Sequence, residues 1–341
     1  MKIRILGCGF YGAHLAVALL ADGHDVEVHE LADDIFTGAS GGAPARIHLG
    51  FHYPRSGATQ AACRDHFAAF MESYGHLTAG VPVNLYAVAK HDSLVDFVSY
   101  CDTLRGKVEF VTVQPEEHGL ENVEGAVLTG ERHIVVRKAR DHFLTALDGR
   151  ISYGVRHERI DDPRWDLTVD CTFCANDDEN IDRFEPCVMV LLKTEDVHKA
   201  VTIMDGPFGS IYPFDEANRL VSLTSAKLTP ISKITRTWRE ARMILDAQTK
   251  GALEARAEAM VFDMARFYPA VRWNYEVADF RLSIRAMPRS GADSRLVDVV
   301  RVGERALRVR AGKIDAVFHA ARIVKNFLRD ARRTMKQAMV A

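Results

Sequence analysis

Three glycines near the N-terminus have the spacing of a dinucleotide-binding turn. Gly7, Gly9 and Gly12 form a Gly-x-Gly-x-x-Gly pattern. In such a turn the first glycine allows a tight bend and the second lets the backbone approach a pyrophosphate. The third lets the next helix pack closely on its strand, and the helix N-terminus offers free N–H groups to the phosphates. The pattern therefore predicts a bound dinucleotide, with a ligand-free turn as the alternative.

An acidic residue follows at the distance that ribose recognition requires. Glu30 lies roughly twenty residues after the turn. A carboxylate there accepts hydrogen bonds from ribose hydroxyls and repels a 2′-phosphate. The sequence therefore favours FAD or NAD over NADP.

The residues around the turn have the strand–helix–strand order that must position it. Residues 2–6 are apolar enough for a strand, and residues 11–21 repeat apolar side chains at helical spacing. Residues 25–30 then alternate between apolar and polar side chains, as a second strand does. Together these segments predict a βαβ unit.

Periodicity predicts further helices and strands along the chain, with a glycine-rich loop at 35–56. The expected helices are 59–74, 94–104, 137–147, 234–264 and 314–339. The expected strands are 81–90, 108–113, 151–160, 166–172, 187–192, 200–204, 210–214, 219–225 and 280–287, the four between 187 and 225 being antiparallel.

Composition limits the class of protein. The chain has 341 residues, 48% of them hydrophobic and 26% charged, which indicates a folded protein with two lobes. A net charge of −2 makes nucleic acid an unexpected partner, and we expect no membrane-spanning segment and no secretion signal. The basic residues from Arg322 onward fit the solvent-exposed face of a last helix. Six scattered cysteines favour a reducing cytoplasm over a disulfide framework.

Beyond the turn, several segments resemble the D-amino-acid oxidase superfamily of flavoproteins. Residues 38–42 (GASGG) and 46–53 (RIHLGFHY) resemble the loop that runs past the flavin pyrophosphate and under the isoalloxazine ring. Residues 283–288 (SIRAMP) resemble the family's Gly-x-Arg-Pro segment, and 307–321 resemble its closing strand–Gly–helix. Residues 166–175 resemble the late strand of its FAD domain. The resemblance implies FAD as the cofactor.

The resemblance also implies an α/β fold with two domains. A Rossmann-type FAD-binding domain of the glutathione-reductase-like class would comprise residues 1–80, 136–180 and 281–341. An antiparallel-sheet substrate domain would comprise residues 81–135 and 181–280. The turn and the resemblance together assign cofactor contacts to Gly7, Gly9, Phe10, Tyr11, Gly12, Glu30, Ser40, Arg46, Ile47, His48, Val155, Cys171, Gly312, Lys313 and Ile314.

Two histidines and an arginine in the loop could carry chemistry. His48 and His52 are each a candidate base or dipole partner at the substrate, or an ordinary loop histidine. The resemblance adds covalent flavin attachment through His48 as a further alternative. Arg46 could neutralise a phosphate or a substrate acid.

Three residues in the second half of the chain are further catalytic candidates. Arg285 could clamp a substrate carboxylate, with a structural salt bridge as the alternative. The resemblance places Tyr212 in the pocket roof, with core packing as the alternative. Lys313, beside Gly312, could stabilise the reduced flavin near N1 or be a solvated lysine. We expect no metal, because Cys171 and Cys174 have no second pair and fit two structural thiols better.

The resemblance implies a flavin-dependent oxidoreductase that dehydrogenates a C–N or C–O bond of an amino-acid-like or hydroxy-acid-like substrate. Hydride would pass to flavin N5, and oxygen or another acceptor would reoxidise the flavin. The substrate would be a small molecule, free or tethered to a carrier. A flavin monooxygenase is one alternative, although its Gly-Asp segment is replaced by Gly303-Glu304 and Gly312-Lys313. A redox-neutral, sugar-mutase-like flavoenzyme and a non-enzymatic nucleotide-binding module are the others.

Overall fold

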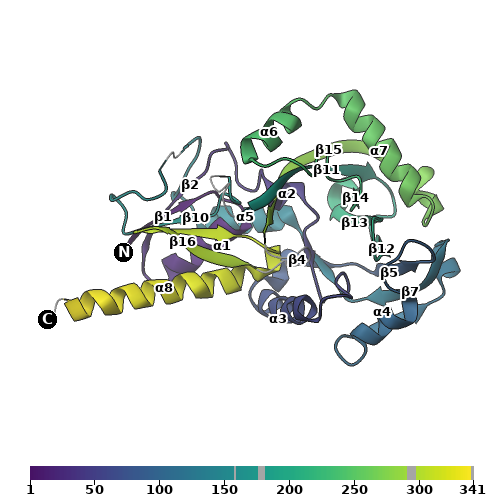
Figure 1. The fold of residues 1–341 in the computed structure, drawn as a ribbon, viewed down its shortest axis with the longest axis horizontal. Helices are drawn as coiled ribbons and strands as arrows, with labels where there is room; N and C mark the ends of the chain where they lie inside the picture. Colours follow the sequence, from purple (N-terminus) through teal and green to yellow (C-terminus); the bar gives the residue numbers. More distant parts are fainter. Residues whose placement is uncertain (157–158, 176–180, 290–296, 339–341) are drawn as a thin grey trace. The chain divides into compact units, whose positions relative to one another are not determined.

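The chain divides into two compact units (Figure 1). A computed structural model describes all residues except 157–158, 176–180, 290–296 and 339–341. Unit 1 contains Met1–Ser40, Arg137–Ile181 and Ser290–Ala341, and unit 2 contains Gly41–Val136 and Asp182–Arg289.

Unit 1 is built on a six-stranded sheet of Rossmann type. From edge to edge its strands are β16 (Asp298–Gly303), β17 (Ala306–Arg310), β10 (Leu167–Asp170), β1 (Lys2–Leu6), β2 (Asp25–His29) and β9 (Ile151–Ser152). All neighbouring pairs are parallel except β16 with β17. Apolar side chains of β1 and β2 are fully buried, as expected for a parallel sheet covered by helices. The predicted Rossmann-type α/β fold is confirmed.

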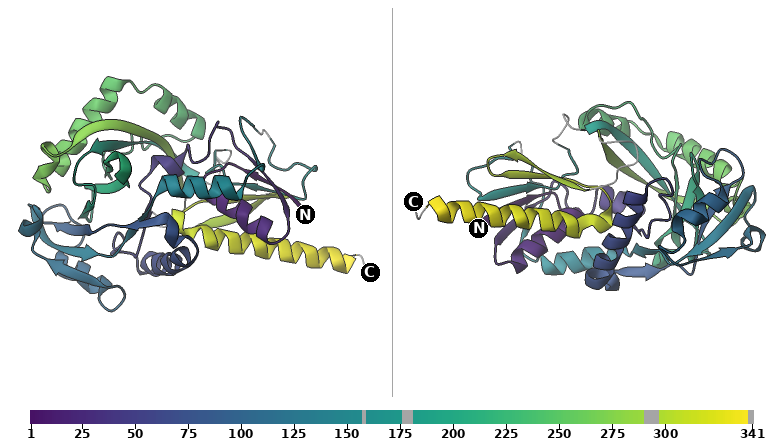
Figure 2. Two further views of the ribbon diagram at one scale, coloured as in Figure 1. Left: turned by 180° about the vertical axis from the view of Figure 1, so that it is seen from behind. Right: turned by 60° about the horizontal axis from the view of Figure 1, so that its bottom comes forward.

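Helices α1 (Phe10–Ala21) and α8 (Val317–Ala338) lie side by side in unit 1 (Figure 2). The His14 ring meets the Phe318 ring at 4.6 Å between centroids. Helix α5 (Val136–Ala146) brings Phe143 to the first residue of α1, with the Phe10 and Phe143 ring centroids 5.2 Å apart. These contacts fix the start of α1, which follows the glycine-rich turn.

Unit 2 is built on an eight-stranded sheet. Its strands, in order, are β15 (Glu276–Pro288), β11 (Ile181–Lys193), β14 (Leu220–Ser225), β13 (Gly209–Asp215), β12 (Lys199–Met204), β5 (Val83–Ala89), β7 (Val123–Thr129) and β6 (Phe110–Val113). The predicted antiparallel pairing holds for β11 to β14, whereas β12 and β5 are parallel.

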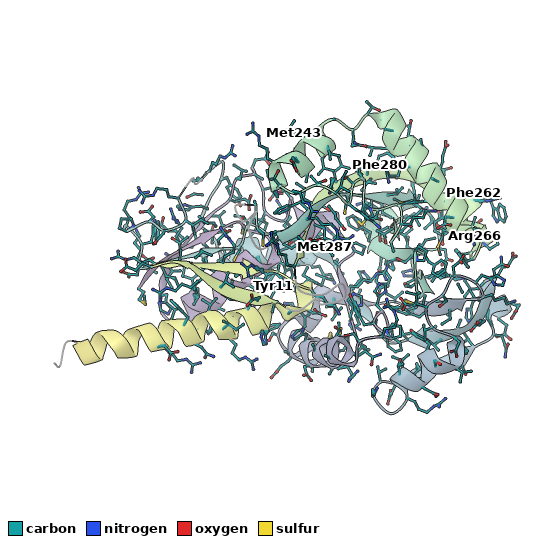
Figure 3. All side chains as sticks on the ribbon, in the orientation of Figure 1. Tyr11, Met243, Phe262, Arg266, Phe280 and Met287 are labelled. Atoms are coloured by element: carbon teal, nitrogen blue, oxygen red, sulfur yellow. The ribbon has the colours of Figure 1, made fainter. Side chains whose placement is uncertain are left out.

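One face of this sheet carries the apolar core of unit 2. Val190, Ile211 and Leu223 belong to a buried cluster that includes Met260 and Met264 of helix α7. Helices α6 (Trp238–Asp246) and α7 (Lys250–Met264) lie next to β15 (Figure 1). Figure 3 shows Phe262 on the outer side of α7. This residue is 65% exposed.

A small three-stranded sheet in unit 2 holds the loop that the sequence singled out. In order its strands are β3 (Arg46–Ile47), β8 (Arg132–Ile134) and β4 (Thr78–Gly80), both pairs being antiparallel. The other described α-helices are α2 (Ala39–Gly42), α3 (Gly57–Tyr74) and α4 (Phe97–Leu104). Among the described helices none is both long and apolar enough to cross a membrane.

The predicted elements need several corrections. The single helix expected over 234–264 is wrong, because Thr237 and Thr249 each cap a separate helix with their side chains. Only β9 forms within the strand expected over 151–160, part of which lies outside the described residues. The last helix begins with a 3₁₀ turn at Ile314–Ala316, and its expected end at Met339 is likewise not described.

The division into units also differs from the predicted domain boundaries. Residues 41–80 and 281–289, expected with the nucleotide-binding domain, belong to unit 2. The reason is strand pairing, since β3 and β4 pair with β8 and most of β15 belongs to the eight-stranded sheet. Which residues of the two units contact cofactor and substrate stays a prediction.

Candidate functional site

The glycine-rich turn of unit 1 has the backbone that a nucleotide cradle requires. Gly7 has φ +85°, a conformation that side chains rarely allow. A Cβ atom on Gly12 would lie 1.9 Å from the Gly7 carbonyl oxygen, so only glycine lets α1 approach this closely. A Cβ atom on Gly9 would lie 3.1 Å from Ser40 Oγ. Each of the three glycines is therefore explained by the geometry of the turn.

The N-terminus of α1 is capped by a residue from a distant segment. The Phe10 amide donates to Ser40 Oγ at 2.9 Å, and Gly9, the N-cap residue, provides no side chain. Ser40 thus lies beside the turn, and its contact with a pyrophosphate stays a prediction. Helix N-termini favour anions because their amides and dipole are positive there.

Glu30 is fixed directly to the turn. Its carboxylate accepts hydrogen bonds from the Cys8 amide at 2.6 Å and from the Ala32 amide at 2.9 Å. The Val155 amide donates to the Glu30 carbonyl oxygen at 3.0 Å, which places both predicted residues together. Burial, followed by the charge of Glu30, raises the pKa of the Cys8 thiol to about 12, so this thiol stays protonated.

Two further predicted cofactor segments lie near the turn within unit 1. A Cβ atom on Gly7 would lie 3.0 Å from the Cys171 carbonyl oxygen. The Tyr11 hydroxyl donates to the Lys313 carbonyl oxygen, and Ile314 then starts the 3₁₀ turn before α8. Unit 1 thus gathers Glu30, Ser40, Val155, Cys171 and the Gly312–Ile314 segment around one turn.

These residues fit the adenosine diphosphate part of a dinucleotide. The fit rests on the tight glycine turn, on the helix N-terminus and on a carboxylate held at the end of β2. Among the described residues no group of three or more His, Cys, Asp or Glu side chains could hold a metal ion. Cys171 is a free thiol, and burial raises its pKa well above the ordinary value.

In unit 2 the fold brings together two segments that are far apart in the sequence. The Ser283 hydroxyl donates to the Gly42 carbonyl oxygen at 3.3 Å. A Cβ atom on Gly42 would lie 3.1 Å from the Ser283 Cβ, so a larger residue would push these segments apart. The predicted loop and the predicted Ser283–Pro288 segment therefore meet.

His48 lies beside a buried carboxylate that the sequence did not reveal. His48 Nδ1 is 3.6 Å from Glu131 Oε1, and the Glu131 side chain is fully buried. The same carboxylate accepts hydrogen bonds from the Tyr86 hydroxyl at 2.6 Å and from the Leu49 amide at 2.7 Å. Burial opposes ionisation, but the His48 charge and these hydrogen bonds outweigh it and lower the Glu131 pKa to about 2.

The second loop histidine belongs to an aromatic group around His48. His52 has its ring centroid 5.9 Å from that of His48 and 6.3 Å from that of Tyr86. Tyr53 meets the edges of both histidine rings. His48 lies beside a carboxylate, which is a geometry suited to proton transfer.

Arg46 and Tyr212 contact each other. The Arg46 guanidinium lies 4.2 Å from the centroid of the Tyr212 ring, and both residues are buried. The Asn84 side-chain amide donates to the Tyr212 hydroxyl at 3.2 Å. Ile47 is fully buried next to Arg46 in β3. Contact of Arg46 or Ile47 with the cofactor stays a prediction.

Arg285 forms the salt bridge that the sequence left as the alternative. Its Nε donates to Glu185 Oε2 at 2.9 Å, and its Nη2 contacts the same oxygen. Arg183 Nε donates to the other Glu185 oxygen at 2.7 Å. The Arg285 side chain is still 37% exposed, so a role at a substrate carboxylate stays a prediction.

Comparison with known proteins places the chain in a family. No protein-family model matches it. It is 31% identical over 340 residues to FAD-dependent monooxygenase FPY4 of Fusarium mangiferae, covering 96% of this chain and 91% of FPY4. The chain belongs to the family of FAD-dependent oxidoreductases. This membership confirms the predicted enzyme class and argues against a non-enzymatic module.

Solved structures show the same fold for this FAD-dependent oxidoreductase. Glycerophosphate oxidase of Mycoplasma pneumoniae superposes with a TM-score of 0.68 at 13% identity, covering 94% of this chain and 92% of that one. Glycine oxidase of Geobacillus kaustophilus gives 0.66 at 15% identity, covering 93% and 90%. Both confirm the fold that the predicted resemblance implied.

Proposed function

We propose that this chain binds FAD on unit 1 and oxidises a small substrate at a carbon that carries nitrogen or oxygen. The observation that carries the reaction is the buried Glu131 carboxylate beside His48. The superfamily fold supports the same class of reaction, since the neighbours are named as oxidases of glycine and glycerophosphate.

The residues of unit 1 would hold the cofactor. The Glu30 carboxylate, fixed by two backbone amides, would accept hydrogen bonds from the adenosine ribose. The turn at Gly7 to Gly12 and the start of α1 would bind the pyrophosphate, with Ser40 beside them. When bound, FAD accepts a hydride from the substrate at N5 of its ring.

His48 would take the proton that leaves the substrate. As the C–H bond gives up its hydride with two electrons, the N–H or O–H group on the same carbon loses its proton to the imidazole. The ionised Glu131 would stabilise the resulting imidazolium, and the Tyr86 hydroxyl and Leu49 amide would keep that carboxylate in place. The family resemblance implies that this loop lies under the flavin ring.

An anaerobic titration tests the proposal. Purified protein loaded with FAD is mixed with amines, amino acids or hydroxy acids, and the visible flavin band is followed. Bleaching by one substrate class, with formation of the imine or carbonyl product, would support it. A colourless protein that cannot be reconstituted with FAD would overturn the cofactor assignment, and an unbleached flavin would overturn the reaction.

A monooxygenase is the second candidate, because the relative FPY4 bears that name. The missing Gly-Asp segment argues against this candidate, whereas the name of FPY4 supports it. A monooxygenase needs an external reductant and places one oxygen atom of O₂ in its product. Mass spectrometry after a reaction under ¹⁸O₂ separates the two, since simple dehydrogenation leaves the label out of the product. We place either reaction in the reducing cytoplasm, on the strength of the cysteine content.

A further inference from the structure

Arg46 is buried, and no ion pair with a carboxylate is found for it among the described residues. It is only 6% exposed. Its Nη1 donates to Thr202 Oγ1 at 3.1 Å and its Nη2 donates to Ser210 Oγ at 2.6 Å. Its Nε has no hydrogen-bond partner among the described residues. Within the described part of the chain, the polar and ring contacts found for this guanidinium are with two neutral hydroxyls and the Tyr212 ring.

Other buried arginines of this chain are neutralised. Arg4 lies 3.1 Å from an oxygen of Asp162, and Arg308 lies 2.8 Å from an oxygen of Asp170. Burying a charge costs several kcal/mol unless an opposite charge and hydrogen bonds compensate it. Within the described part of the chain, no such ion pair is shown for Arg46.

The Glu131 carboxylate is already bound by other groups. Its oxygens accept from Tyr86 and from the Leu49 amide, and His48 lies beside it. Glu131 and Arg46 both affect the pKa of Tyr86. Burial raises this pKa most, Glu131 raises it further and Arg46 lowers it. The Arg46 Nε–H is therefore left for a group that is not part of the described protein.

Arg46 faces a row of hydroxyls across the sheet. Strand register aligns Tyr86, Thr202, Ser210 and Thr224 on four neighbouring strands. Ser210 Oγ and Thr224 Oγ1 are 3.1 Å apart, and Arg46 binds the two central residues of the row. The opposite face of the same strands is apolar, so Arg46 and these buried hydroxyls form a polar patch inside unit 2.

We propose that Arg46 binds an anionic group of the substrate, a carboxylate or a phosphate, at this row of hydroxyls. The inference rests on the proposed function and narrows it to acidic substrates. Arg46 would donate through Nε and reorient its terminal nitrogens, while Thr202 and Ser210 supply further hydrogen bonds to the same anion. The anion would neutralise the buried guanidinium, so the site and the substrate stabilise each other.

The first experiment measures anion binding without turnover. The thermal unfolding midpoint of FAD-loaded protein is recorded with acetate, glycolate or inorganic phosphate against chloride at equal ionic strength. We expect a saturable rise with either carboxylates or phosphate, and its absence after Arg46→Met. Arg132→Met is the matched control, because Arg132 lies on the neighbouring strand β8 and its side chain donates to Thr78 Oγ1 and to the Thr78 carbonyl oxygen. It should keep the rise.

Two results would overturn the proposal: no rise in the wild-type protein with any of the anions, or an equal rise in Arg46→Met. If Arg46→Met does not fold, Arg46→Lys keeps the charge but loses the forked geometry, and the anion concentration for half the rise should increase about tenfold. These probes bind whether or not a substrate is oxidised. Failure here is therefore distinct from failure of the proposed reaction, which flavin bleaching reports.

Once a substrate is known, steady-state kinetics complete the test. Arg46→Met should raise KM for an acidic substrate by about 10- to 100-fold, the range for losing a charged hydrogen-bonded contact. The corresponding amide or ester substrate should lose this dependence on Arg46. Equal KM values for the acid and the amide in the wild-type protein would contradict an anion site.

Discussion

The Tyr86 hydroxyl donates a hydrogen bond to the Glu131 carboxylate at 2.6 Å, and both side chains are buried. Tyr86 lies in β5, whereas Glu131 lies between β7 and β8 and also faces His48. The carboxylate is thus held from two sides, which fixes the position of His48. Proton transfer at the proposed site therefore depends on groups that do not touch the substrate themselves.

Glu131→Gln should lower kcat by about 100-fold with a small change in KM, because His48 would lose the charge that stabilises its protonated form. The pH profile should change as well, which a purely structural effect would not produce. Glu124→Gln is the control, since Glu124 lies on the adjoining strand β7 and its carboxylate accepts from the Phe97 amide at 2.8 Å. An unchanged pH profile in Glu131→Gln would remove Glu131 from the mechanism.

Stability should fall at acid pH because of the same carboxylate. The folded-state pKa of Glu131 is about 2, below the ordinary value near 4.5. Its contribution is then complete above about pH 4.5 and is lost as the pH falls through the folded-state pKa. Urea unfolding between pH 2 and pH 6 should show a shallower pH dependence in Glu131→Gln, and identical curves would contradict this assignment.

Glu30→Gln should weaken FAD binding while leaving the fold intact. The amide can accept from only one of the Cys8 and Ala32 amides at a time through its single oxygen, and it loses the charge that ribose hydroxyls favour. We expect about a 10-fold higher dissociation constant, measured by quenching of flavin fluorescence. Glu27→Gln, on the same strand but half-exposed, is the control and should bind FAD normally. Equal affinity in both variants would remove Glu30 from the ribose site.

Arg285→Met separates a structural role from substrate binding. Removing the guanidinium leaves Glu185 buried with Arg183 as its described ion-pair partner, so we expect a loss of roughly 1–3 kcal/mol in unfolding free energy. The double variant Arg285→Met with Glu185→Met should recover most of this loss, because no buried charge is left unpaired. If Arg285 also clamps a carboxylate, KM should stay raised in the double variant. A fully recovered KM would assign Arg285 to the salt bridge alone.

The sequence by itself determined the βαβ unit and its cofactor class. The roles of Gly7, Gly12 and Glu30 depend on contacts within one short stretch of chain. Within such a stretch, residue spacing and periodicity indicate the local geometry. For the same reason most helices and strands were predicted with the right type, although two threonine caps divide residues 234–264 and only β9 forms within the strand expected over 151–160.

Only the tertiary structure decided what surrounds the proposed substrate site. Glu131 stands in a short connection where an acidic residue is normally solvated, and nothing local indicates that β5 brings Tyr86 against it. Arg46 and Arg285 look alike in the sequence, yet one meets hydroxyls and the other meets Glu185. Strand pairing between distant segments sets these partners. The free-energy cost of burying a charged group depends on whether such partners are in place.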